Sequence, residues 1–425
     1  MVSHWLNSFC CANYLRAALL WLLAVGAAMA QTNNEYLRET YQQKFNQLIE
    51  GETGVADYVQ ISNKGVTIYA SPADKKANKS EYFLEWDNLA VFRALIRHKP
   101  QLAYELYQKK KTPETALSLL QKIKEPFGWN ANDLLRPLVG IKIAIDPGHI
   151  AGNMETARME GKYIQMDLDD EKIGFYESEI AWETAQVLKY KLEGLGAQVM
   201  LTRSAPGNTA FGITYKAWYD RYLQQKKDKK ESIKGLTEDR VFGTTFRVMD
   251  LLERCNNINL FQPDLTVVIH YNVDGGNAPW RQPTKKNYNV AFVGGGFLES
   301  ELKNQDDRFQ LLRLLLTDEL EKSIELSRYV LDSFESILKV PTDKSPYYGN
   351  SLPTGTPGVN SRNLTLTRKV YGIICYGESL YQDNEQECRA LNRKEEIIAG
   401  IRTSKRVVEV ADAYLEGILN FYRAQ

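Results

Sequence analysis

From residue 141 onward, short apolar runs alternate with longer amphipathic stretches, and this alternation most constrains the fold. The apolar runs lie at 141–145, 198–201, 265–269, 289–293 and 370–376. Each is short and apolar enough to be a strand buried on both faces of a sheet. The longer stretches with helical spacing lie mainly at 177–195, 205–260, 301–338 and 395–422. Strands that alternate with helices predict an α/β fold, with a largely parallel twisted sheet flanked by helices.

The residues before this pattern have a different organisation. A helical stretch at 35–50 precedes a hairpin pattern at 58–69, and two further helical stretches follow it. Proline and glycine residues between 126 and 137 then mark a boundary. We therefore expect a small α+β region of unknown role at 31–138. The main domain is expected at 139–425, with insertions at about 205–250 and 299–320.

The first thirty residues have the pattern of a secretory signal peptide. Arg16 precedes an apolar run, and Ala28-Met29-Ala30 resembles a cleavage site. An uncleaved anchor is the alternative, although the run is shorter than the ~20 residues of a membrane-spanning helix. We expect an exported protein with no membrane span once the signal is removed. The net charge of zero argues against a nucleic-acid partner and favours a periplasm over the extracellular space, because anionic wall polymers would not attract a neutral chain.

Removal of the signal would leave three cysteines in the mature chain. Cys255 is expected to be a buried thiol. Cys375 and Cys388 could form a disulfide, and their spacing alone does not decide the matter.

Histidine is scarce, with four residues in the whole chain, and two of them directly follow predicted buried strands. Asp146-Pro147-Gly148 leads to His149, and the run at 265–269 leads to His270. Ligands bind at the carboxyl ends of the strands of an α/β sheet. His98 lies in the N-terminal region with no second ligand candidate nearby.

Two histidines and a carboxylate form a common catalytic zinc set with an open coordination position. Glu177 and Glu179 lie between the histidine strands, at the start of the helix predicted over 177–195. Either carboxylate could instead serve only to stabilise the helix N-terminus through the helix dipole. The residues taken alone therefore leave the third ligand open.

Residues 140–422 resemble the zinc-dependent N-acetylmuramoyl-L-alanine amidases of the amidase-3 family. Five stretches match in order, and each is weak alone. They are Ile143-Ala-Ile-Asp-Pro-Gly-His149, the segment from Glu177 through Gly196 to Arg203, the segment from Leu251 through Arg254 to Asn259, Val267-Val-Ile-His-Tyr-Asn272, and Glu378-Ser-Leu-Tyr-Gln-Asp-Asn384.

The resemblance implies hydrolysis of the amide between N-acetylmuramic acid and L-alanine in peptidoglycan. It implies one zinc ion held by His149, Glu177 and His270, with Glu378 as the catalytic general acid and base. Three further residues are candidates for orienting the ligands or contacting the substrate: Asp146, Asn272 and Arg254.

Departures from the family pattern leave several alternatives open. The interval before Glu177 is unusually long, so Glu155, Glu160 and Glu171 remain candidate ligands. Gly377 stands where an apolar residue is usual, which affects the placement of Glu378. Glu385 and Glu387 compete for the catalytic role, but they are expected to lie beyond the strand end in solvent.

Some relatives carry a helix that blocks the zinc until a protein activator removes it. The apolar stretch at 311–316 is either such a gate or core packing. Two other functions compete with the amidase: an inactive amidase-like protein that binds peptidoglycan or regulates another hydrolase, and a zinc peptidase. The peptidase has no motif support such as a helical His-Glu-x-x-His.

Overall fold

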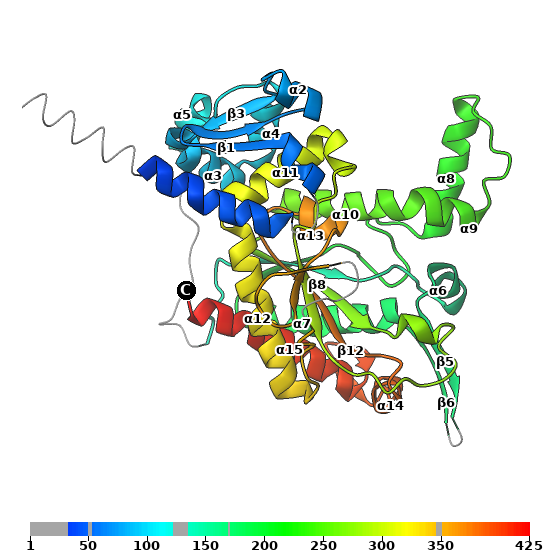
Figure 1. Cartoon of the computed structure of the whole chain (residues 1–425). Helices are drawn as coiled ribbons and strands as arrows, with labels where there is room; N and C mark the ends of the chain where they lie inside the picture. Colours follow the sequence, from blue (N-terminus) through cyan, green and yellow to red (C-terminus); the bar gives the residue numbers. More distant parts are fainter. Residues whose placement is uncertain (1–32, 50–52, 122–134, 169–170, 346–350) are drawn as a thin grey trace, which may run out of the picture. The chain divides into compact units, whose positions relative to one another are not determined.

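The computed structural model describes residues 33–49, 53–121, 135–168, 171–345 and 351–425 (Figure 1). The chain divides into two compact units, one formed by residues 1–121 with 297–316 and the other by 122–296 with 317–425. The expected signal peptide, residues 1–30, lies outside the described residues. Among the described helices, none is long and apolar enough to cross a membrane.

The first unit is a small α+β structure. A helix spans 33–48, and a three-stranded antiparallel sheet has the order β1-β2-β3. The strands are β1 (Val59–Ser62), β2 (Gly65–Ile68) and β3 (Tyr82–Glu85). The further α-helices of its N-terminal segment are α2 (Pro72–Lys76), α3 (Leu89–His98), α4 (Pro100–Gln108) and α5 (Leu117–Leu120).

A helix from the later sequence, α11 (Gln305–Leu316), completes the first unit. Arg308 Nη2 donates to Glu81 Oε1 at 2.9 Å, and both side chains are buried. The Phe309 ring lies 4.9 Å from that of Tyr104, and residues 311–316 are all buried. Core packing therefore accounts for this apolar stretch, which belongs to the same unit as the N-terminal sheet.

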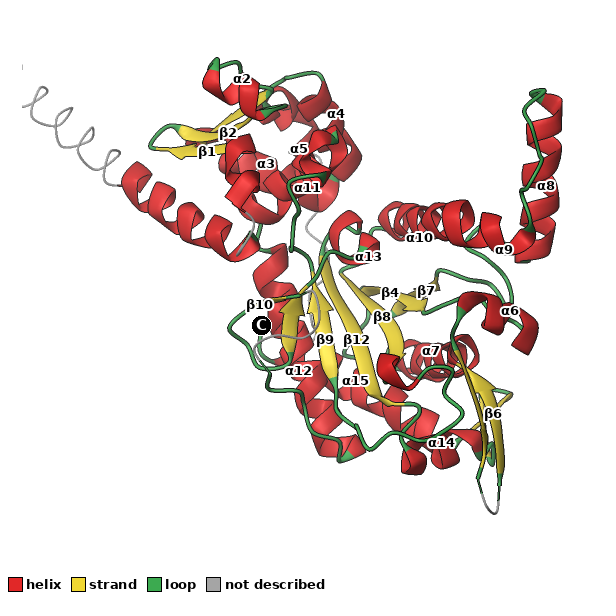
Figure 2. Cartoon of the chain, turned by 45° about the vertical axis from the view of Figure 1, so that its right-hand side comes forward, coloured by secondary structure: helices red, strands yellow, loops and turns green. Residues whose placement is uncertain are grey.

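The second unit contains a seven-stranded sheet with the order β10-β11-β9-β12-β8-β4-β7 (Figure 2). Its strands are β4 (Lys142–Pro147), β7 (Gln198–Leu201), β8 (Leu265–Asn272), β9 (Val290–Val293), β10 (Leu352–Pro353), β11 (Val359–Ser361) and β12 (Ile373–Tyr381). Four neighbours, β12, β8, β4 and β7, run parallel. β9 runs antiparallel to β12, and β10 to β11, so the sheet is mixed. The expected α/β fold is confirmed.

Helices cover the sheet of the second unit. Figure 1 shows α7, α12 and α15 on one side and α10 with α13 on the other. The α-helices are α6 (Met154–Glu160), α7 (Glu177–Gly194), α8 (Tyr215–Asp228), α9 (Glu238–Val241), α10 (Arg247–Phe261), α12 (Glu319–Leu338), α13 (Thr365–Lys369), α14 (Glu385–Asn392) and α15 (Lys405–Arg423). Two hairpins lie outside the main sheet: β5 (Tyr163–Asp167) with β6 (Lys172–Tyr176), and β13 (Glu396–Ile398) with β14 (Ile401–Thr403).

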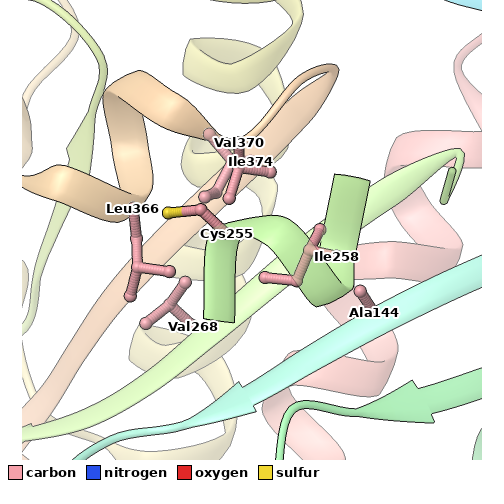
Figure 3. Close-up of a cluster of buried hydrophobic side chains, with 7 residues drawn as sticks. All are labelled: Ala144, Cys255, Ile258, Val268, Leu366, Val370 and Ile374. Carbon is pink, nitrogen blue, oxygen red and sulfur yellow. The ribbon is translucent and has the colours of Figure 1, made fainter. Parts of the chain in front are cut away.

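A buried apolar cluster joins α10 and α13 to the central strands (Figure 3). Its members are Ala144, Cys255, Ile258, Val268, Leu366, Val370 and Ile374. Burial of such side chains contributes ~25 cal/mol per Å² of apolar surface. The cluster fixes α10 over the parallel strands, and this places the polar residues of α10 next to the end of β4.

Two boundaries differ from the sequence-based prediction. β12 continues to Tyr381, five residues past the predicted end at 376, because backbone pairing with β8 continues after the apolar run stops. The last helix begins at Lys405, ten residues after the predicted start at 395, because the β13–β14 hairpin takes up 396–403. Apolar periodicity indicates which side chains are buried. It does not show where backbone pairing between strands continues through polar residues.

The three described cysteines, Cys255, Cys375 and Cys388, are all free and buried. The disulfide considered for Cys375 and Cys388 is therefore not formed. Burial raises the pKa of the Cys255 thiol to about 12, so this residue is an inert core thiol.

Candidate metal centre

His149 follows β4 through a sharp turn and lies at the carboxyl edge of the sheet. Its own backbone has φ of 60°, in the left-handed region. The preceding residue, Gly148, leaves room for the second histidine: a Cβ at this position would lie 2.5 Å from Cε1 of His270. The two imidazole rings accordingly approach edge to face, with centroids 4.8 Å apart.

Replacing Gly148 with alanine is expected to displace the His270 ring and weaken metal binding. An approach of 2.5 Å is far inside van der Waals contact, and the ring lies between structured elements, so the turn or the imidazole must move. Zinc affinity, measured by competition with a chelator, should fall at least about 10-fold, as for the loss of a ligand-orienting contact. Gly174→Ala is the matched control, because nothing lies within 4 Å of the Cβ that it would add. Equal zinc affinity in both variants would contradict this account.

His270 lies near the end of β8, paired in register with Glu378 of β12. Because paired residues of parallel strands point to the same face, both side chains project toward the side covered by α10 and α13. The ring of Tyr376, on the same face, stacks on the imidazole of His270 with centroids 4.6 Å apart and planes 9° apart. This stacking holds the ring of His270 in one plane.

Glu177 is the first residue of α7, and its carboxylate is fully buried between the two histidines. Its Oε1 lies 3.2 Å from Nε2 of His149 and 2.9 Å from Nδ1 of His270. One ligand atom from each of these three residues lies within 4.8 Å of the others. The structure therefore brings together a group of two histidines and one glutamate that could hold a metal ion.

The other carboxylates considered as ligands lie elsewhere. Glu155 is exposed on α6, and Glu171 pairs with Arg389 at 3.4 Å. Glu179 pairs with Lys394 at 2.6 Å. Glu160 faces the far nitrogen of His149, with Oε1 3.2 Å from Nδ1. Glu177 alone among them lies between the two histidines.

The charges of the site favour a cation. Burial opposes protonation of His149, but the carboxylates of Glu177 and Glu160 outweigh it and raise the pKa to about 9. Burial likewise opposes ionisation of Glu177, but His149 and Lys162 hold its pKa well below the usual range. Nε2 of His149 is buried with no hydrogen-bond partner. A lone imidazole nitrogen beside a buried carboxylate fits a metal ligand set, and metal binding would release the proton that His149 holds.

Glu378 occupies the strand position beside His270, with its side chain half-buried. Burial and the negative charge of Glu177 raise its pKa. Two neighbouring carboxyl groups with pKa values shifted in opposite directions are suited to different tasks, a permanent anion and a proton carrier.

The two competing glutamates do not approach this position. Glu385 begins α14 and is exposed, as expected. Glu387 was expected in solvent, and this expectation is wrong. It is buried and its Oε2 pairs with Nε of Arg406 at 2.7 Å, because α14 packs against α15.

Asp146 and Arg254 hold the turn that carries His149. Arg254 Nη1 lies 3.2 Å from both carboxylate oxygens of Asp146, and its Nη2 donates to the carbonyl of His149 at 2.9 Å. Arg203 adds hydrogen bonds to the carbonyls of residues 147 and 148. The side-chain oxygen of Asn272 accepts the N–H of Val273 at the end of β8.

Tyr414 of α15 explains the glycine before Glu378. A Cβ on Gly377 would lie 2.2 Å from the hydroxyl oxygen of Tyr414. That hydroxyl donates to the carbonyl of Gly377 at 3.1 Å. The tyrosine therefore fills the space that a side chain at 377 would occupy, and β12 keeps its register with β8.

Replacing Gly377 with valine is expected to destabilise the protein by about 1–3 kcal/mol through overpacking against Tyr414. The shift in urea midpoint would measure the loss. The double variant Gly377→Val, Tyr414→Phe should recover part of it, since the oxygen is then gone. A fully stable single variant would contradict the packing described here.

Sequence reasoning missed several contacts of the centre. Gln382 Nε2 donates to Glu177 Oε2 at 3.0 Å, and Lys162 Nζ lies 3.6 Å from the same oxygen. Gln382 lies within the family-like stretch from Glu378 to Asn384, so its place in that motif could have identified it as a residue of the site. Lys162 and Tyr376 carried no signal in the sequence pattern.

Comparison with known proteins gives one family. The model described as N-acetylmuramoyl-L-alanine amidase (Amidase_3) matches residues 143–418. No curated protein sequence matches the chain.

Several solved structures are similar to the chain at low sequence identity. The CwlD amidase from Clostridioides difficile, in complex with the GerS lipoprotein, is 15% identical, covers 67% of this chain and 100% of its own, and has a TM-score of 0.38. The amidase Ami1 from Mycobacterium smegmatis is 15% identical over 68% of this chain and 99% of its own, with a TM-score of 0.40. The catalytic domain of CwlV from Bacillus (Paenibacillus) polymyxa var. colistinus is 12% identical over 67% and 99%, with a TM-score of 0.35.

Proposed function

The chain belongs to the N-acetylmuramoyl-L-alanine amidase family, and from this premise we propose that it is an exported enzyme that uses one zinc ion. Its substrate is peptidoglycan or a muropeptide, and the bond it cleaves joins N-acetylmuramic acid to L-alanine. The observation that carries the proposal is the meeting of His149, Glu177 and His270, with Glu378 paired beside His270.

The residues present fit zinc. Two imidazoles and one carboxylate are a common catalytic zinc set, and His149 offers a buried nitrogen without a hydrogen-bond partner. Zinc, when bound there, supplies Lewis acidity, which polarises a carbonyl and acidifies water. The carboxyl group of Glu160 lies behind His149, and the side-chain amide of Gln382 donates to the outer oxygen of Glu177.

Glu378 supplies the proton transfers. As a carboxylate it takes a proton from the attacking water, and as a carboxylic acid it gives that proton to the nitrogen of the departing alanine. Burial and the charge of Glu177 raise its pKa, so this carboxyl group holds a proton more readily than an exposed glutamate does.

Export and partners are further parts of the proposal. The signal-peptide pattern of residues 1–30 supports export, and the net charge of zero favours a periplasm. A protein activator is an additional partner that the family resemblance suggests. Asp146 and Arg254 are proposed to position His149, and Asn272 to contact the ligands or the substrate.

One experiment tests the function. The purified protein is incubated with peptidoglycan or a muramyl-peptide, with and without a metal chelator, and the new amino termini are identified. L-alanine termini that disappear with chelator support the amidase. Binding without cleavage, at every metal concentration and unchanged by Glu378→Ala, would instead establish an inactive wall-binding protein. Termini from within the stem peptide would establish a peptidase.

A further inference from the structure

The turn at residues 160–162 contacts two of the three candidate ligands, His149 and Glu177. It closes α6, inside the long interval between the first two candidate ligands. Gly161 caps the helix with φ of 69°, a left-handed conformation that glycine adopts freely. The two residues that flank this glycine, Glu160 and Lys162, carry opposite charges and point into the metal centre.

Glu160 lies behind the first histidine. Its Oε1 is 3.2 Å from Nδ1 of His149 and also accepts the N–H of Ile150 at 3.1 Å. Its Oε2 accepts the N–H of Ala151 at 3.3 Å. The Glu160 carboxylate thus contacts both the ring of His149 and the backbone N–H groups that follow it. In this orientation Nε2 of the ring faces Glu177.

Lys162 lies behind the carboxylate ligand. Its Nζ is 3.6 Å from Glu177 Oε2, and its backbone carbonyl accepts the N–H of Glu177 at 3.2 Å. Gln382 donates to the same Oε2 at 3.0 Å. Oε2 thus accepts the hydrogen bond from Gln382 and forms the ion pair with Lys162, so Oε1 is the oxygen left facing the nitrogens of His149 and His270.

We propose that Glu160 and Lys162 are positioning residues for the metal, one orienting His149 and the other orienting Glu177. This inference rests on the proposed function and adds a role for α6, which lies in the long interval between His149 and Glu177. A carboxylate on the outer nitrogen of a ligating histidine fixes its tautomer and raises its basicity. A cation on the outer oxygen of a ligating carboxylate leaves the inner oxygen as the donor.

The test measures zinc affinity of the full chain by chelator competition. Glu160→Gln keeps the size of the side chain and removes its charge, and Lys162→Met keeps the length and removes the cation. Each is expected to weaken zinc binding by about 10–100-fold, the usual effect of an outer ligand partner. Glu155→Gln and Lys172→Met are matched controls in the same interval between His149 and Glu177, since both residues are exposed. Both controls should bind zinc like wild type.

Further measurements separate positioning from general stability. Lys162→Arg should recover most of the zinc affinity, because a cation is restored. Urea midpoints of the metal-free variants should stay near that of the metal-free wild type. At saturating zinc, the kcat of Glu160→Gln and of Lys162→Met should be close to that of wild type, although both variants bind zinc more weakly.

Wild-type zinc affinity in both Glu160→Gln and Lys162→Met would overturn the inference. So would a loss of affinity matched by an equal loss of metal-free stability. Neither result would bear on the proposed function, which instead fails if wild-type protein loaded with zinc releases no L-alanine termini.

Discussion

Replacing Glu378 with glutamine is expected to lower kcat by about 10²–10⁴-fold, the range for removal of a general acid and base. Glutamine preserves the shape of the side chain but can neither accept a proton from water nor deliver one to nitrogen. Glu378 of β12 lies opposite His270 of β8 in the strand register. It is not one of the three candidate metal ligands. Zinc content should therefore remain one equivalent, and KM should change little.

The measurement is the rate of L-alanine termini released from a muramyl-peptide at saturating substrate. Glu385→Gln is the matched control: Glu385 is exposed seven positions later in the chain and pairs with Arg389 at 3.2 Å. Its kcat should equal that of wild type. A Glu378→Gln variant that retains full kcat, or that loses its zinc, would remove Glu378 from the proposed role.

Replacing His270 with alanine is expected to abolish zinc binding under ordinary conditions, and activity with it. Loss of an outer partner alone costs about 10–100-fold in metal affinity, so loss of a ligand costs more. His270 is also the residue against which Gly148, Glu177 and Tyr376 pack. His149→Ala should likewise abolish zinc binding, because His149 is the other histidine that faces Glu177.

Metal content of the purified variants, measured by elemental analysis, checks this prediction. His98→Ala is the control, because His98 is the remaining described histidine and belongs to the first unit. It should keep one equivalent of zinc. A His270→Ala variant with wild-type zinc content and activity would show that the metal, if any, binds elsewhere.

Much of the fold was predictable because burial leaves a periodic trace in the sequence. The runs that became β4, β7, β8 and β9 are short and apolar, and each was expected within a few residues of its observed bounds. The α6 helix and the β5–β6 hairpin were not predicted. α6 buries a single residue, Ala157, so no helical period stands out there. β5 and β6 do alternate, with Ile164, Met166, Ile173 and Phe175 buried, and this short alternation was overlooked.

The two histidines were predictable for a simple physical reason. A parallel sheet brings the carboxyl ends of its strands to one edge, so residues that end two such strands meet whatever the intervening chain does. Glu378 was a candidate only through the family resemblance. Its exact place, within β12 and beside His270, required knowing that the ladder continues to Tyr381.

The amino-acid sequence thus sufficed for the α/β class, the two candidate histidine ligands and the family. It left the third ligand open among several glutamates, since all are the same chemical group and most lie in one interval. Folding separated them by partner: Glu171 lies with Arg389, Glu160 behind His149, and Glu177 between the histidines. Such a choice depends on distances between residues far apart in the chain, and these distances arise only when the helices pack on the sheet.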